Sequence, residues 1–189
     1  WDNLKKLRHK IIPPVPSLFT FNNKDERIKG LSGISVPNAT VQVAASDLEA
    51  SGPLLITHWG FSGPAILRLS AWGARELNDR FYRFPIMINW IGRDEDEVLA
   101  DFNEEKKHSG KKRIGNHAHY GIPLRLWKSM VAGAGIKSTA TWGDLSGKDL
   151  KHLVSELCCA VFQISGKSTF KDEFVTAGGV DLRDVDFKS

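Results

Sequence analysis

The chain has 189 residues, of which 41% are hydrophobic and 10% aromatic, so it can bury a core and is not disordered as a whole. Its apolar runs are too short to cross a bilayer and no secretory signal is present, so we expect a cytoplasmic protein without membrane contact. The formal net charge of +4 is modest, and much of the excess comes from residues 106–113, which is only a weak reason to consider nucleic acid.

The amino-terminal half is predicted to consist mainly of strands. Residues 1–8 favour a helix, and because the chain begins inside this element we expect a trimmed chain. Pro13, Pro14 and Pro16 are predicted to end that helix and to turn the chain. Alternating or continuous apolar patterns then predict strands at 17–21, 40–44, 53–57 and 84–91, with one helix near 63–78.

The following part is predicted to be helical before the chain returns to strands. A helix with acidic residues first begins near Asp94, and two more are expected at 123–132 and 146–159. Cys158 and Cys159 lack the C-x-x-C spacing of a redox or zinc site, so we expect them to act as small apolar residues. Strands are expected again at 160–165 and 173–176. This order predicts an α+β fold with a β-rich lobe, residues 1–92 and 160–189, and an inserted helical lobe, residues 93–159.

The densest cluster of polar residues and glycines lies at residues 57–64. A buried strand delivers Thr57 and His58 to a glycine-rich turn, and Ser62 is expected to cap the next helix, with Pro64 in its first turn. Unpaired amides at such a helix start can bind an anion or a carbonyl oxygen. The hydrolase pattern G-x-S-x-G fails at Pro64, so we favour the capping role of Ser62 over a nucleophile. For the loop itself, a ligand-facing role and a purely structural role stay equally open.

Three other motifs carry less information. Residues 166–169 resemble the end of a phosphate-binding loop but lack its earlier glycine, so we expect a turn. His117 and His119 have no further metal ligand nearby in the sequence, so we expect a solvated loop and no metal site. In the segment 176–180, two glycines after a strand permit close backbone approach to a ring system or another chain segment, or form a simple turn. Spacing and composition define no catalytic residue.

Several stretches resemble the bacterial NAD(P)/FAD-dependent oxidoreductases that carry an insert domain, a family that includes aminoacetone-oxidase-like proteins. In that family a β-barrel-like lobe with a small helical lobe splits the FAD-binding domain, so the resemblance implies an α+β fold with a β-barrel-like lobe and an inserted α-helical lobe. The dinucleotide fingerprint G-x-G-x-x-G is missing here, which implies a fragment that is inactive in isolation. The matching stretches are residues 13–18, 31–36, 52–72, 123–127 and 170–180.

The resemblance further implies that the chain covers the flavin and the substrate in a larger enzyme. Its partner would be the remainder of the same polypeptide, its substrate a small molecule and its cofactor FAD, with NAD(P)H as the candidate reductant; we do not expect nucleic acid as a partner. His58 would act as an acid or base, or else be a buried structural histidine. The residues implied to face the cofactor are Thr57, His58, Ser62, Gly63, Thr176, Gly178 and Gly179.

A second hypothesis belongs to a different class of function. In it, the chain is a basic binding module whose residues 106–113 contact RNA or an acidic protein. The more ordinary interpretation of that charged run is a solvated helix end.

Overall fold

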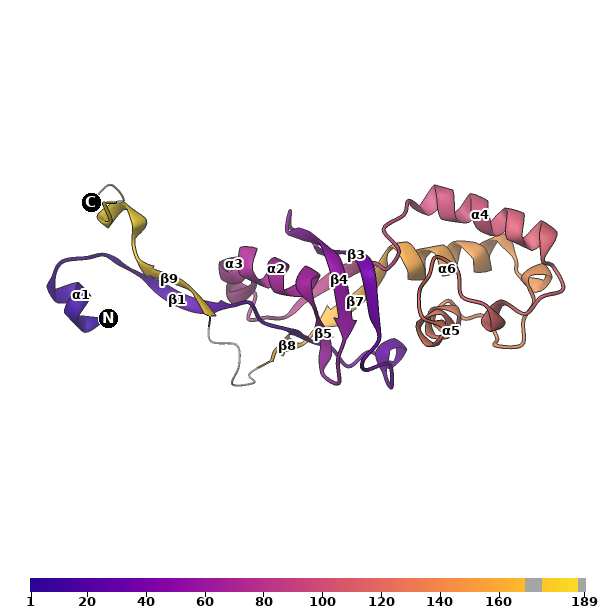
Figure 1. Cartoon of the computed structure of the whole chain (residues 1–189), viewed down its shortest axis with the longest axis horizontal. Coiled ribbons are helices and arrows are strands. Elements are labelled where there is room, and N and C mark those ends of the chain that lie inside the picture. The colour runs from indigo at the N-terminus through magenta and orange to yellow at the C-terminus, as the bar shows by residue number, and fades with distance from the viewer. Residues whose placement is uncertain (169–174, 187–189) are drawn as a thin grey trace.

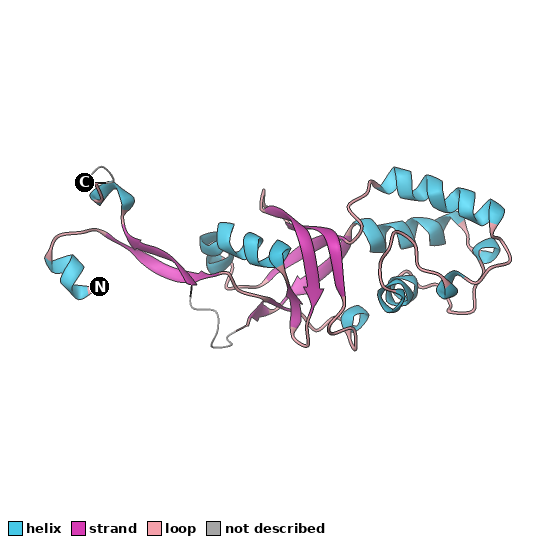
Figure 2. Ribbon diagram, in the orientation of Figure 1, coloured by secondary structure: helices cyan, strands magenta, loops and turns pink. Residues whose placement is uncertain are grey.

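The protein is seen here in a computed structural model, which describes residues 1–168 and 175–186. Its parts follow one another along a single long axis: a two-stranded ribbon, a curved sheet with two covering helices, and a group of helices (Figure 1). Figure 2 shows that the strands lie in the ribbon and the centre, while the far end is helical. The predicted α+β fold, with a barrel-like part and a helical part, is therefore confirmed.

A seven-stranded antiparallel sheet forms the centre of the molecule, in the order β7-β6-β3-β4-β5-β2-β8. Its two edge strands, β7 and β8, are consecutive in the sequence and are separated only by Ser165. The amide of Ser165 donates to the carbonyl of Asn22 at 3.0 Å, so this one segment joins both edges and closes the sheet into a barrel. The strands are β2 Phe21–Asn22, β3 Ser35–Val43, β4 Glu49–Ile56, β5 Gly60–Ser62, β6 Phe84–Asn89, β7 Ala160–Ile164 and β8 Gly166–Lys167.

The interior of the barrel is packed with aromatic side chains. Phe162 lies with its ring centroid 5.0 Å from that of Phe61 and 5.9 Å from that of Trp90, and all three are buried. Two helices, α2 Pro64–Trp72 and α3 Ala74–Asp79, follow β5 in place of the single helix expected near 63–78. The break falls at Gly73, which caps the end of α2 and the start of α3, because glycine is a poor helix former.

The helical end contains α4 Glu95–His108, α5 Leu124–Gly133 and α6 Gly147–Cys158, within two residues of the predicted helices. Ser146 caps α6 as expected, in a capping box with Asp149. Short 3-10 turns, η2 Ile114–Asn116 and η3 Trp142–Asp144, connect the helices. Cys158 and Cys159 are free thiols at the end of α6. In the described parts of the chain, no helix combines the length and the apolar character needed to span a membrane.

The ribbon consists of β1 Ile11–Ser17 and β9 Val175–Val180, which pair antiparallel, with the helix α1 Asp2–Lys6 before it and the turn η4 Leu182–Asp184 after it. The expectation that Pro13, Pro14 and Pro16 turn the chain is wrong, because all three lie within β1. Proline is tolerated there because β1 pairs on one side only and its register shifts between Ile12 and Val15. The strand expected at 17–21 is also wrong: β1 ends at Ser17 and β2 begins at Phe21. Of the strand expected at 173–176, residues 173 and 174 lie outside the described residues.

Candidate functional site

The tip between β4 and β5 is a tight turn that the hydroxyl of Thr57 holds together. Its oxygen accepts hydrogen bonds from the amides of Trp59 and Gly60, both at 3.2 Å. The backbone closes the same turn, with the amide of Thr57 donating to the carbonyl of Gly60 at 2.8 Å. The Thr57 hydroxyl thus stabilises the turn through hydrogen bonds. His58 lies at the tip of the turn, where it is exposed and not buried.

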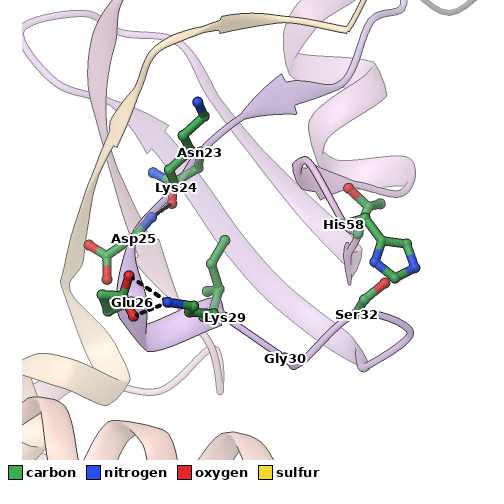
Figure 3. Close-up of a pocket in the computed structure, with 10 residues that line it drawn as sticks. Asn23, Lys24, Asp25, Glu26, Lys29, Gly30, Ser32 and His58 are labelled. Atoms are coloured by element: carbon green, nitrogen blue, oxygen red, sulfur yellow. Dashed lines mark hydrogen bonds and ion pairs between the residues drawn. The ribbon is translucent and has the colours of Figure 1, made fainter.

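A hollow of about 450 Å³ lies between this turn and the loop that includes η1 Glu26–Ile28. In Figure 3, one wall of the hollow is formed by Asn23, Lys24, Asp25, Glu26 and Lys29, and His58 with Ser32 lies on the other side. The wall carries charges of both signs, and Lys29 pairs with Glu26 at 3.0 Å. The hollow has the volume of a ligand site, and its lining is polar and open to solvent.

Arg27 fixes the η1 loop to the rest of the molecule. Its guanidinium donates to Glu156 of α6 at 2.8 and 3.0 Å and to Asp25 at 2.9 Å. The same group lies over the ring of Phe162, 4.1 Å from the ring centroid. The Arg27 bond to Asp25 lowers the pKa of that carboxyl below its ordinary value. One side chain therefore joins the barrel, the η1 loop and the helical part.

The residues that follow the turn are used in packing. Ser62 lies in β5, paired with Leu55, so the prediction that it caps the helix is wrong; Gly63 holds that position. Gly63 has a φ of +96°, and a Cβ atom there would lie 2.8 Å from the carbonyl oxygen of Pro53. The glycine is therefore required by the close approach of β4.

The segment with Thr176, Gly178 and Gly179 is a strand, because all three residues lie in β9, so the alternative of a simple turn is wrong. A Cβ atom at Gly178 would lie 2.8 Å from the carbonyl oxygen of Pro13 in β1, and one at Gly179 would lie 3.4 Å from the ring of Trp1. Of the possible reasons for two glycines, the structure supports close approach to another chain segment.

The predicted cofactor-facing residues therefore do not converge. Thr57 and His58 line the hollow of Figure 3, Ser62 and Gly63 continue into β5 and α2, and the other three lie in the ribbon. A flavin dinucleotide site needs a glycine-rich turn whose amides are free to bind the pyrophosphate. Here the space beside Gly63 and Gly178 is filled by neighbouring backbone, so these residues do not fit a complete FAD site by themselves.

A second cluster of aromatic rings surrounds His119 in the helical part. The imidazole lies 5.1 Å from Trp127 and 5.2 Å from Trp142, centroid to centroid. The expected solvated loop is correct for His117, which is exposed, and wrong for His119, which is half-buried. No group of three His, Cys, Asp or Glu side chains suited to a metal ion occurs among the described residues.

Burial lowers the pKa of His119 below that of an unfolded histidine, because desolvation disfavours the imidazolium. The stabilisation from the neutral ring is then present above about pH 6.5, the unfolded pKa, and is lost as the pH falls through the lower folded pKa. We expect His119→Phe to reduce the loss of unfolding free energy between pH 7.5 and pH 5.5, measured by urea denaturation. His117→Gln is the control and should keep the slope of the native chain. Equal slopes in His119→Phe and the native chain would contradict this role.

The basic run 106–113 is in part tied into the fold. Lys106 donates to the carbonyl of Leu145, and Lys107 pairs with Glu104. Beyond the end of α4, the loop is held because the amide of Gly143 donates to the carbonyl of Gly110 at 2.8 Å. The last three residues of the run, 111–113, are exposed. The sequence alone did not separate the anchored lysines from these exposed ones.

The combination of the barrel with this helical part indicates the structural class to which the protein belongs. The chain belongs to the family described as "HI0933-like protein barrel and H2TH domain", which matches residues 15–175. That family lies within the flavoprotein-like oxidoreductase superfamily, so the resemblance to flavoproteins is confirmed at this level. The finer likeness to aminoacetone-oxidase-like proteins stays a prediction.

Two curated relatives carry the name "Ribosomal RNA dihydrouridine synthase". The protein of Haemophilus influenzae is 28% identical over 182 residues, which cover 95% of this chain and 42% of the relative. The protein of Escherichia coli K12 is 28% identical over 162 residues, 85% of this chain and 37% of the relative. The chain thus spans about two fifths of the length of these relatives.

Proposed function

We propose that this chain is the insert domain of a larger flavin-dependent oxidoreductase that modifies RNA, and that it is not catalytic alone. The observation that best supports the insert role is the antiparallel pairing of β1 with β9. This pairing places the first and last strands of the chain side by side. Both ends of the chain lie at the ribbon end of the molecule (Figure 1). An insertion into another domain requires this geometry. The division into lobes of residues 1–92 with 160–189 and 93–159 is part of the proposal.

RNA as the substrate is supported by the names of the curated relatives and by the exposed cations beyond α4. This departs from the sequence-based expectation of a small-molecule substrate without nucleic acid. The proposal combines the flavoprotein hypothesis with the hypothesis of a basic binding module. One chain can cover a flavin at one end and contact RNA at the other. A ribosomal RNA substrate would imply that the protein acts in the cytoplasm.

FAD would be held by the remainder of the polypeptide, and NAD(P)H is the candidate donor of electrons. Reduced flavin, held by that remainder, would supply the hydride that, together with a proton, reduces the C5–C6 double bond of uracil. In this arrangement the barrel provides a wall that excludes water, with Thr57 and His58 at the hollow of Figure 3. No proton transfer is assigned to His58.

The test is complementation with the complete gene that encodes this chain. An Escherichia coli strain lacking its own relative is expected to regain dihydrouridine in ribosomal RNA, measured by nucleoside mass spectrometry. The purified full-length protein should show flavin absorbance near 450 nm. A flavin-containing protein that restores no dihydrouridine would overturn the RNA substrate. A full-length protein without flavin would overturn the oxidoreductase assignment.

A further inference from the structure

Positive charge is strongly segregated along the helical part. Between residues 106 and 140 the sequence contains eight lysines and arginines and no aspartate or glutamate. The acidic residues of this part include a cluster in the first turns of α4, where Arg93 pairs with Glu97 and Asp101. Helix α4 has 14 residues and is about 21 Å long, roughly twice the screening length at physiological salt. The acidic first turns of α4 therefore do little to neutralise the basic run, whose neighbouring acidic residues on the helix are Glu104 and Glu105.

Among the described residues, several of these cations have no acidic partner. Two of the eight contact backbone carbonyls, Lys106 at Leu145 and Arg125 at Gly30, and Lys107 pairs with Glu104. The remaining five are exposed, and within residues 1–168 and 175–186 they form no salt bridge: Lys111, Lys112, Arg113, Lys128 and Lys137. Unpaired cations gathered on one part of a fold form the electrostatic footprint typical of nucleic-acid binding.

One of the five lines a small cavity, and two others lie in the loops beside it. A hollow of about 170 Å³ lies between α5 and the η2 turn, and Lys128 contributes to its lining. Arg113 comes two residues before the lining residue Gly115, and Lys137 stands between two lining residues, Ile136 and Ser138. Backbone pairing holds the two loops together, because the amide of Ile114 donates to the carbonyl of Ala140 at 3.1 Å.

We propose that this cavity, with Lys128 in its lining and the exposed Arg113 and Lys137 in the two loops beside it, binds a phosphate of the RNA backbone. The cavity is too small for a dinucleotide cofactor, whose sites usually exceed about 300 Å³. Its lining combines the polar residues Asn116, Lys128 and Ser138 with apolar residues of α5, which suits a phosphate with part of its ribose. This site depends on the proposed function, in which RNA is the substrate. It adds that the RNA is bound at the helical part, far from the ribbon in Figure 1.

The test uses the 189-residue chain and a fluorescein-labelled, 30-nucleotide RNA hairpin, with affinity measured by anisotropy between 50 and 200 mM KCl. The variant Arg113→Gln/Lys128→Gln/Lys137→Gln removes the three cations proposed to hold this phosphate. We expect affinity at 50 mM salt to fall at least about tenfold, and the slope of log affinity against log salt to flatten by about one.

The matched control removes the same charge elsewhere. Lys5→Gln/Lys6→Gln/Arg83→Gln also lowers the net charge by three at exposed positions outside the helical part, and it should bind nearly as well as the native chain. Equal losses in both triple variants, or no RNA binding at 50 mM salt, would overturn the site. Competition by polyglutamate as effective as by unlabelled RNA would indicate an acidic protein partner instead. None of these outcomes bears on the complementation test, which reports on the proposed function separately.

Discussion

Replacing Gly60 with alanine is expected to lower the free energy of unfolding by about 4 kcal/mol or more, an effect large enough to unfold an ordinary domain. Gly60 has a φ of +146°, which alanine rarely adopts. Its added Cβ would lie 2.2 Å from the carbonyl oxygen of Phe21 and 2.5 Å from the amide nitrogen of Asn23. Both atoms belong to backbone that cannot move without opening the pairing of β2 with β5. Urea denaturation followed by tryptophan fluorescence measures the loss.

Gly147→Ala is the control for this substitution. Gly147 is the first residue of α6, and no atom lies within 4 Å of the position of its Cβ. The change should stabilise the chain by about 0.5 kcal/mol, because alanine restricts the unfolded state and favours the helix. A Gly60→Ala chain as soluble and stable as the native one would show that the turn does not need glycine.

Replacing Arg27 with methionine is expected to lower the free energy of unfolding by about 3 kcal/mol. This value is at the lower end of the range for a buried ion pair that loses one partner. Methionine keeps much of the apolar length but leaves Glu156 and Asp25 without their shared cation. The side chain of Glu156 is only 19% exposed, so water replaces the lost bonds poorly. The contact with Phe162 is also lost. The loss is measured by urea denaturation at pH 7.5.

The pH dependence gives a second measurement on the same variant. Because Arg27 lowers the pKa of Asp25, the native chain gains stability that is present above about pH 4 and is lost as the pH falls through the lower folded pKa. The Arg27→Met variant should lack this acid-dependent contribution to the free energy of unfolding. Lys29→Met removes an exposed pair and should change stability by less than about 0.5 kcal/mol at any pH. Equal losses in the two variants would contradict the anchoring role of Arg27.

The features that the sequence predicted well depend on neighbouring residues. The helices α4 and α6 begin at caps, Asp94 and Ser146, whose bonds reach only two or three residues along the chain. The features that it missed depend on distant partners. Arg27 lies in a segment that indicates only a polar turn, and Glu156 is 129 residues away. Prolines that locally favour a turn are held in β1 by β9, and the glycines of β9 are extended for the same reason.

The candidate site was predictable to the same limited degree. The segment with Thr57 and His58 was identified because polar residues and glycines are concentrated there, and both residues line a hollow. Its opposite wall, including Asn23 and Lys29, escaped notice because those residues approach the turn only when the barrel closes. His119 was misplaced because its aromatic neighbours come from three separate segments.

Under the proposed insert role, the ribbon of β1 and β9 would make this unit portable between host proteins. At its inner end Ser17 pairs with Val175, so a two-residue β-turn joining these positions would convert the ribbon into an ordinary hairpin. A host domain could therefore gain or lose everything between them while its own strands kept their register. If the proposed function holds, RNA contacts and flavin chemistry would then be acquired separately, since such an exchange leaves the cofactor-binding part of the host unchanged.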